Sequence, residues 1–142
     1  MKRKISVSLE QIIVSEKTYR ELPTPEGIVD LCAYASFANV FFNLEDNQVI
    51  FNFVEYTQKN EFTLNKNGIL TPIFSADILF EGISFFQMSD RDSEMPIEED
   101  TALDYYVLTG KSSDRLDFFF VLHSGREIYI SAKKMRLIVD FK

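Results

Sequence analysis

The feature that most constrains the fold of this chain is an alternation of apolar and polar side chains at every second residue. Between residues 74 and 81, one parity is apolar throughout: Phe74, Ala76, Ile78 and Phe80. The other parity is polar except for Leu79. Because successive side chains of a strand point to opposite faces, this pattern predicts a strand with one face buried.

A second stretch, "RLDFFFVLH" at 115–123, is apolar on both parities at its centre and predicts an interior strand. The residues "SGR" follow it, and Gly125 there can adopt the positive φ that a tight turn needs. The stretch "EIYIS" then alternates again, so we predict a hairpin over 116–131. A short kink at 132–134 precedes the last predicted strand, 136–141.

Further strands are predicted at 48–56, 61–64 and 103–110, with turns at 45–47 and 65–70. The stretch 27–44 fits either a strand or a helix that is apolar on nearly every side. In short apolar runs, the spacing of apolar residues alone does not distinguish a strand from a helix. Many short strands predict a mainly β fold, either an antiparallel sandwich or a strongly curved sheet. One helix in 27–44, which would make the fold α+β, stays open as the alternative.

The composition is that of one folded domain. The chain has 142 residues, of which 46% are hydrophobic, with 14 Phe and 6 Tyr. A disordered chain is poorer in aromatic residues, and a length of this order is typical of a single domain. We therefore expect residues 1–142 to form one globular domain.

Residues 89–104, "SDRDSEMPIEEDTALD", carry most of the net charge and are called the acidic segment. They combine seven carboxylates with one arginine, a net of −6, so the other 126 residues carry only −1 of the total of −7. The carboxylates are Asp90, Asp92, Glu94, Glu98, Glu99, Asp100 and Asp104. Concentrated negative charge attracts basic proteins and speeds their association. We expect these carboxylates, with the adjacent Tyr105 and Tyr106, to contact a basic protein partner.

A calcium loop and a simple solvated loop are the other interpretations of the acidic segment. Counted from Asp90, oxygen ligands fall at places one, three, five and nine of an EF-hand loop. Place six, however, is Met95 where the sharp turn needs Gly, and place twelve is Thr101 where a bidentate Glu belongs. We therefore expect no metal and no cofactor, with divalent-cation binding kept as an alternative.

The sequence contains no catalytic signature. Its single histidine, His123, adjoins Ser124, but neighbouring strand residues point to opposite faces and do not serve each other as base and nucleophile. The single cysteine, Cys32, stands among apolar neighbours. The five glycines are scattered and form no phosphate-binding loop. We expect a protein that is not an enzyme.

Charge and cysteine content also restrict the partners and the compartment. A pI of about 4.7 disfavours nucleic acid, which requires a basic footprint. The small basic group Lys133, Lys134 and Arg136 is interpreted as a solvated strand edge. One cysteine permits no intramolecular disulfide, and we find neither a signal peptide nor an apolar stretch long enough to span a membrane. We expect a cytoplasmic protein.

Two stretches carry a resemblance to a known class of proteins. "ADILFEGISFF" (76–86) and "FFFVLHSGREIYISAKKMRLIVDF" (118–141) resemble the strand patterns of small bacterial immunity proteins of polymorphic toxin and contact-dependent inhibition systems. The resemblance covers about a third of the chain and rests on core and turn residues. It implies a cytoplasmic, non-enzymatic inhibitor of one cognate toxin, and it assigns no contact residue.

Together these observations predict an immunity protein that neutralises a cognate basic toxin, with nucleases among the candidate toxins, through its acidic surface. The alternatives are a β domain that binds a small ligand or a divalent cation, and an adaptor subunit of unknown partner.

Overall fold

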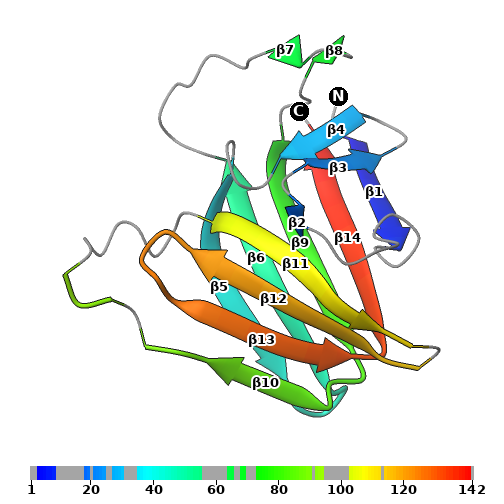
Figure 1. Cartoon of the computed structure of the whole chain (residues 1–142). Coiled ribbons are helices and arrows are strands. Elements are labelled where there is room, and N and C mark those ends of the chain that lie inside the picture. The colour runs from blue at the N-terminus through cyan, green and yellow to red at the C-terminus, as the bar shows by residue number, and fades with distance from the viewer. Residues whose placement is uncertain are drawn as a thin grey trace.

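The fold consists of strands that pair into two large sheets and two short hairpins (Figure 1). It is that of a computed structural model, which describes residues 3–8, 18–19, 21–24, 27–30, 35–55, 64–65, 68–69, 73–90, 92–94, 103–112 and 114–141. Within these residues there is no helix, and hence none long and apolar enough to cross a membrane. The predicted mainly β fold is confirmed.

Sheet A has five strands, and every neighbouring pair is antiparallel. Their order across the sheet is β1 (Arg3–Ser8), β14 (Lys134–Phe141), β9 (Ile73–Glu81), β6 (Gln48–Glu55) and β5 (Ala35–Asn43). The strands predicted around 74–81, 48–56 and 136–141 correspond to β9, β6 and β14. A register shift between Phe37 and Asn39 marks a bulge in the edge strand β5.

Sheet B also has five antiparallel strands and lies across sheet A, with its strands inclined to those of sheet A (Figure 1). Their order is β10 (Phe85–Met88), β13 (Glu127–Ala132), β12 (Leu116–Leu122), β11 (Leu103–Lys111) and β2 (Thr18–Tyr19). Strand β12 lies inside the sheet, as its apolar residues on both parities predicted. The two sheets form the antiparallel sandwich expected from the sequence.

The predicted hairpin at 116–131 is the β12–β13 hairpin. Its turn is closed by the amide of Leu122, which donates to the carbonyl of Arg126 at 2.9 Å. Gly125 has a φ of 84°, the left-handed conformation that glycine adopts without steric cost. The predicted kink is also present: the chain leaves sheet B at Ala132 and enters sheet A at Lys134.

The core lies between the sheets and follows the alternation that the sequence shows. The buried residues of three central strands are Val49, Phe51 and Phe53 in β6, Ala76, Ile78 and Phe80 in β9, and Leu116, Phe118, Phe120 and Leu122 in β12. Aromatic rings join the sheets: Phe120 of sheet B lies 4.9 Å from Phe51 and 6.1 Å from Phe80 of sheet A, both edge-to-face. Edge-to-face packing therefore connects the two layers at their centre.

For the stretch 27–44, which the sequence left open between helix and strand, the described residues are strands: Gly27–Asp30 is β4 and Ala35–Asn43 is β5. Pairing along β6 satisfies the backbone of β5 in place of helical hydrogen bonds. The basic group Lys133, Lys134 and Arg136 is exposed to solvent as expected, but the expected sheet edge is wrong, because Lys134 and Arg136 belong to β14, which lies between β1 and β9.

Four short strands form the two small hairpins. Strand β3 (Glu21–Thr24) pairs with β4, and β7 (Leu64–Asn65) pairs with β8 (Gly68–Ile69). The β7–β8 hairpin spans the turn predicted at 65–70. Of the strand predicted at 61–64, only Leu64 is among the described residues.

Candidate functional site

The first part of the acidic segment is fixed to the β12–β13 hairpin by main-chain hydrogen bonds. The Ser89 amide donates to the Glu127 carbonyl, and the Asp92 amide donates to the Ser124 carbonyl, both at 2.9 Å. Ser89 Oγ accepts from the Glu127 amide at 2.9 Å, and the Ser89 carbonyl accepts from Arg126 Nη1 at 3.2 Å. The backbone that leads into the carboxylates is therefore held at two residues, Ser89 and Asp92, by three bonds to their main-chain atoms and one to the Ser89 hydroxyl.

The carboxylates of this anchored part lie in solvent. Asp90, Asp92 and Glu94 are all exposed. Asp92 Oδ1 accepts a hydrogen bond from the Glu94 amide at 3.0 Å, which shapes the backbone into a local turn. The turn of the β12–β13 hairpin lies close to the acidic segment, since a Cβ added to Gly125 would lie 3.3 Å from Asp92 Cβ. The structure thus presents three negative side chains on a fixed backbone.

The other predicted contact residues are described only in part. Glu98, Glu99 and Asp100 lie outside the described residues. Asp104 and Tyr105 belong to β11, where the register with β12 shifts between Leu103 and Tyr105, and their side chains are outside the description.

The prediction that Tyr106 contacts a partner is wrong. Its side chain has no exposed area, and its ring lies 5.8 Å from Phe118 and 5.8 Å from Phe120. Tyr106 pairs with Phe120 across the sheet, so both side chains share the inner face. Consecutive strand residues point to opposite faces, and the sequence "YY" does not indicate which tyrosine faces inward.

Exposed apolar side chains precede the acidic segment, a feature that sequence reasoning missed. On the edge strand β10, Phe85 is 48% exposed and Met88 is 38% exposed. The neighbouring edge strand β5 meets β10 through Phe42 and Phe86, whose rings are 5.0 Å apart. Apolar groups next to charged ones are typical of protein interfaces. The Phe-rich pattern indicates only strands, because it does not reveal which strands lie at an edge.

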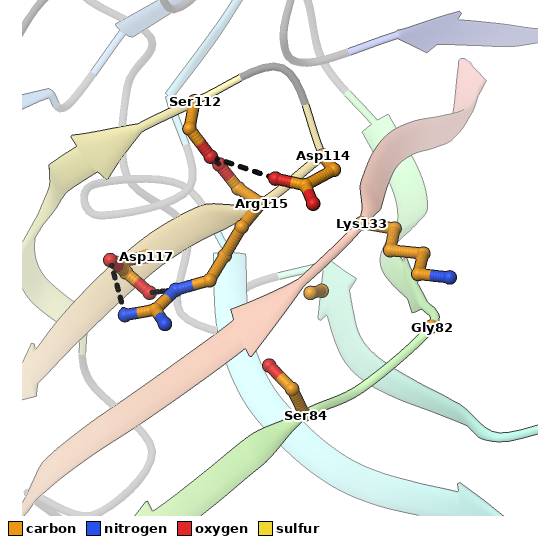
Figure 2. A pocket seen from close by; sticks show the side chains of 8 residues that line it. Gly82, Ser84, Ser112, Asp114, Arg115, Asp117 and Lys133 are labelled. Carbon is orange, nitrogen blue, oxygen red and sulfur yellow. Dashed lines mark hydrogen bonds and ion pairs between the residues drawn. The ribbon is translucent and has the colours of Figure 1, made fainter.

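A groove opens at the other end of the β12–β13 hairpin (Figure 2). Two adjoining hollows of about 560 and 550 Å³ share Ser84, Arg115 and Asp117 in their walls, and we call them together the Arg115 groove. One hollow adds Ser112, Asp114 and Lys133, and the other adds Phe85, Tyr129 and Ser131. Each volume lies in the range of small-molecule sites.

The ion pair between Arg115 and Asp117 divides the Arg115 groove. The guanidinium binds the carboxylate through two atoms, with Nε–Oδ1 at 2.8 Å and Nη2–Oδ2 at 3.1 Å. Asp117 Oδ1 also accepts from Ser131 Oγ at 2.5 Å. The hydrogen bonds from Arg115 hold the pKa of the Asp117 carboxyl below its ordinary value, against the smaller opposing effect of burial. Asp117 is therefore a fixed anion that orients Arg115.

Two glycines make room for the charged groups of the groove. A Cβ on Gly110 would lie 2.9 Å from Asp117 Oδ2, and a Cβ on Gly82 would lie 2.9 Å from Lys133 Cγ and Cδ. Gly82 also has a φ of 68°. Figure 2 shows the stem of Lys133 near Gly82, across the opening from the Arg115–Asp117 pair. A larger residue at either glycine would displace a charged side chain.

The two residues considered for nucleophilic catalysis lie in the turn after β12, where the alternation of a strand no longer applies. His123 is exposed and Ser124 is buried. Cys32 lies outside the described residues. Within the described ranges, no three His, Cys, Asp or Glu side chains gather as metal ligands.

No protein-family model matches this chain, and no curated protein matches it. Among solved structures, it is similar to the crystal structure of an uncharacterized protein from Neisseria gonorrhoeae, with 16% sequence identity and a TM-score of 0.49. The alignment covers 87% of this chain and 96% of that one.

Proposed function

We propose that this chain is a non-enzymatic binding protein that neutralises a basic protein, in the manner of a cytoplasmic immunity protein acting on a cognate toxin. The observation that carries the proposal is the anchored start of the acidic segment, where four hydrogen bonds hold Ser89 and Asp92 and where Asp90, Asp92 and Glu94 stay exposed. A fixed backbone reduces the entropy that ordering a charged loop would cost on binding.

The two kinds of side chain at this surface have different effects on binding. An exposed ion pair contributes only about 0.2–1 kcal/mol, so the carboxylates act mainly by steering the partner and raising its association rate. The exposed Met88, two residues before Asp90, supplies apolar area that a complex would bury, which slows dissociation. A toxin with a cationic face, such as a nuclease, is the partner that this combination fits.

The test compares two variants with the same change of charge. In the first, Asp90→Asn is combined with Asp92→Asn, which keeps the Oδ1 acceptor for the Glu94 amide. In the control, Asp114→Asn is combined with Asp140→Asn, two acids away from the anchored part of the segment. Each immobilised protein is used to capture partners from the source cells, and association rates of the captured protein are measured at low and high salt.

We expect the first variant to associate about three- to tenfold more slowly at low salt, with little difference at high salt. The control should bind like the wild type. The captured protein should stop the growth of a host that produces it alone, and this chain should restore growth. Equal binding and salt dependence of both variants would show that these carboxylates do not contact the partner. A captured protein that is harmless alone would reject the immunity role.

A second function, binding of a small ligand, is favoured by the Arg115 groove. Ligand binding there is compatible with binding of a basic protein, because the Arg115 groove and the anchored part of the acidic segment lie at opposite ends of β12. This strand spans seven residues and thus about 20 Å.

A further inference from the structure

The Arg115 groove is built from segments that are distant in the chain. Ser84 stands just before β10, Arg115 stands just before β12, and Asp117 is the second residue of β12. Ser131 lies at the end of β13, and Lys133 follows it. Their side chains meet where the chain passes from sheet B to sheet A. Gly82 and Gly110 are the positions at which any side chain would collide with Lys133 or Asp117.

The charges that line the groove cancel. Arg115 and Lys133 are cationic, and Asp114 and Asp117 are anionic. A site for phosphate or another strong anion would instead show an excess of positive charge. The balance favours a ligand that has no net charge.

Donors and acceptors of hydrogen bonds are both plentiful in the groove. A guanidinium has five N–H groups, and the fork to Asp117 uses two of them, which leaves three directed elsewhere. The ammonium of Lys133 and the hydroxyl of Ser84 add donors, whereas the hydroxyl of Ser112 donates its one proton to Asp114 Oδ1 at 3.1 Å. Asp114 is exposed and has a second carboxylate oxygen that accepts. The ligand should therefore carry many hydroxyl-like groups that both donate and accept.

The other wall of the groove is a fixed aromatic surface. Tyr129 is 39% exposed, and its ring stacks on Phe119 at 4.7 Å with 28° between the planes. Its hydroxyl donates to Glu127 Oε2 at 2.9 Å. Phe85 beside it is 48% exposed. The negative face of an aromatic ring attracts polarised C–H groups, so a flat ring with axial C–H bonds fits this wall.

We propose that the Arg115 groove binds an uncharged carbohydrate. One sugar ring lies with its C–H face on Tyr129 and bonds to Arg115, and a following ring in the adjoining hollow bonds to Asp114. The proposal is independent of the toxin-neutralising function, because it involves none of the residues of the acidic segment.

The probe is an array of defined oligosaccharides, part of them neutral and part of them sialylated or sulfated. The protein carries a biotin at one terminus and is assembled on streptavidin, so that weak single-site affinities give a measurable signal. The variants are Tyr129→Ala, which removes the stacking wall, and Asp114→Asn, which changes one carboxylate acceptor. The control is Phe41→Ala, an equally truncated aromatic on β5 that is 53% exposed and outside the groove. Circular dichroism and thermal unfolding establish that each variant is folded.

We expect the wild type to retain neutral oligosaccharides, Tyr129→Ala to lose at least about tenfold of that signal, and Phe41→Ala to match the wild type. Asp114→Asn should weaken binding about threefold or more, because it replaces an ionised acceptor. Titration of the best oligosaccharide should shift the amide resonances of Ser84, Ser112 and Tyr129. Retention of only the charged oligosaccharides, or no oligosaccharide retained more strongly by the wild type than by Tyr129→Ala, would overturn the proposal. Neither result bears on binding to a basic protein.

Discussion

Replacing Phe51 with alanine should remove the principal contact between the two sheets. Phe51 has no exposed area and lies on β6, between β9 and the edge strand β5. Its ring contacts Phe80 at 5.1 Å and Phe37 at 5.4 Å within sheet A, and Phe120 at 4.9 Å in sheet B. The surrounding rings are held by two sheets and cannot collapse fully into the space left behind.

The expected loss of stability follows from burial and from the cavity. Truncation of a buried phenylalanine costs about 3–5 kcal/mol, the lost transfer energy and the unfilled cavity together. We take about 4 kcal/mol, close to a thousandfold in the folding equilibrium. For a chain of this length the urea m-value is about 2 kcal/mol per molar, so the unfolding midpoint should fall by about 2 M. Phe41→Ala, on the exposed face, should change stability by less than about 0.5 kcal/mol.

The assay is urea unfolding followed by circular dichroism, with Phe41→Ala as the matched control. If Phe51→Ala is too unstable to fold, Phe51→Leu should still fold and lose about 1–1.5 kcal/mol. Equal losses for Phe51→Ala and Phe41→Ala would refute the assignment of the inner face of sheet A. A small loss for both Phe51 variants would refute the aromatic contact between the sheets.

Two further predictions concern single residues. Because Arg115 holds the pKa of Asp117 down, ionised Asp117 stabilises the fold above the unfolded-chain pKa of about 3.9, and this contribution is lost as pH falls through the folded pKa. The difference in Tm between wild type and Asp117→Asn should therefore be constant near neutral pH and shrink below about pH 4; a difference that grew in acid would contradict it. Gly125→Ala should cost about 1–2 kcal/mol in urea unfolding, because φ is 84° and the new Cβ would lie 3.3 Å from Asp92; unchanged stability would argue against this turn.

Much of the secondary structure could be predicted from local sequence. The alternation in 74–81 and 115–123 identified β9 and β12, and Gly125 identified the turn of the hairpin. The sequence could not exclude a helix in 27–44, because a short apolar run is compatible with a helix or a strand. Which of the two forms depends on the segment that pairs with it. For β5 that segment is β6, which pairs with it along nearly its whole length.

The candidate sites were predictable to different degrees. The acidic segment stood out because seven carboxylates lie within sixteen residues, and the structure places Asp90, Asp92 and Glu94 in solvent. Tyr106 was assigned to the surface wrongly, because parity within "YY" is set by the register with β12. The Arg115 groove could not be predicted from the sequence, because its residues come from three separate stretches, 82–85, 112–117 and 129–133, which only the fold brings together.

The sequence by itself determined that this chain forms strands, where its main hairpin turns, and where its negative charge is concentrated. These properties are local, since the alternation of side chains and the conformational freedom of glycine depend only on neighbouring residues. The tertiary structure alone decided the strand order, which strands lie at an edge, and which distant polar groups meet. That order places β14, at the end of the chain, between β1 and β9. Such pairings are selected by how two apolar faces close on each other, and no local pattern encodes that choice.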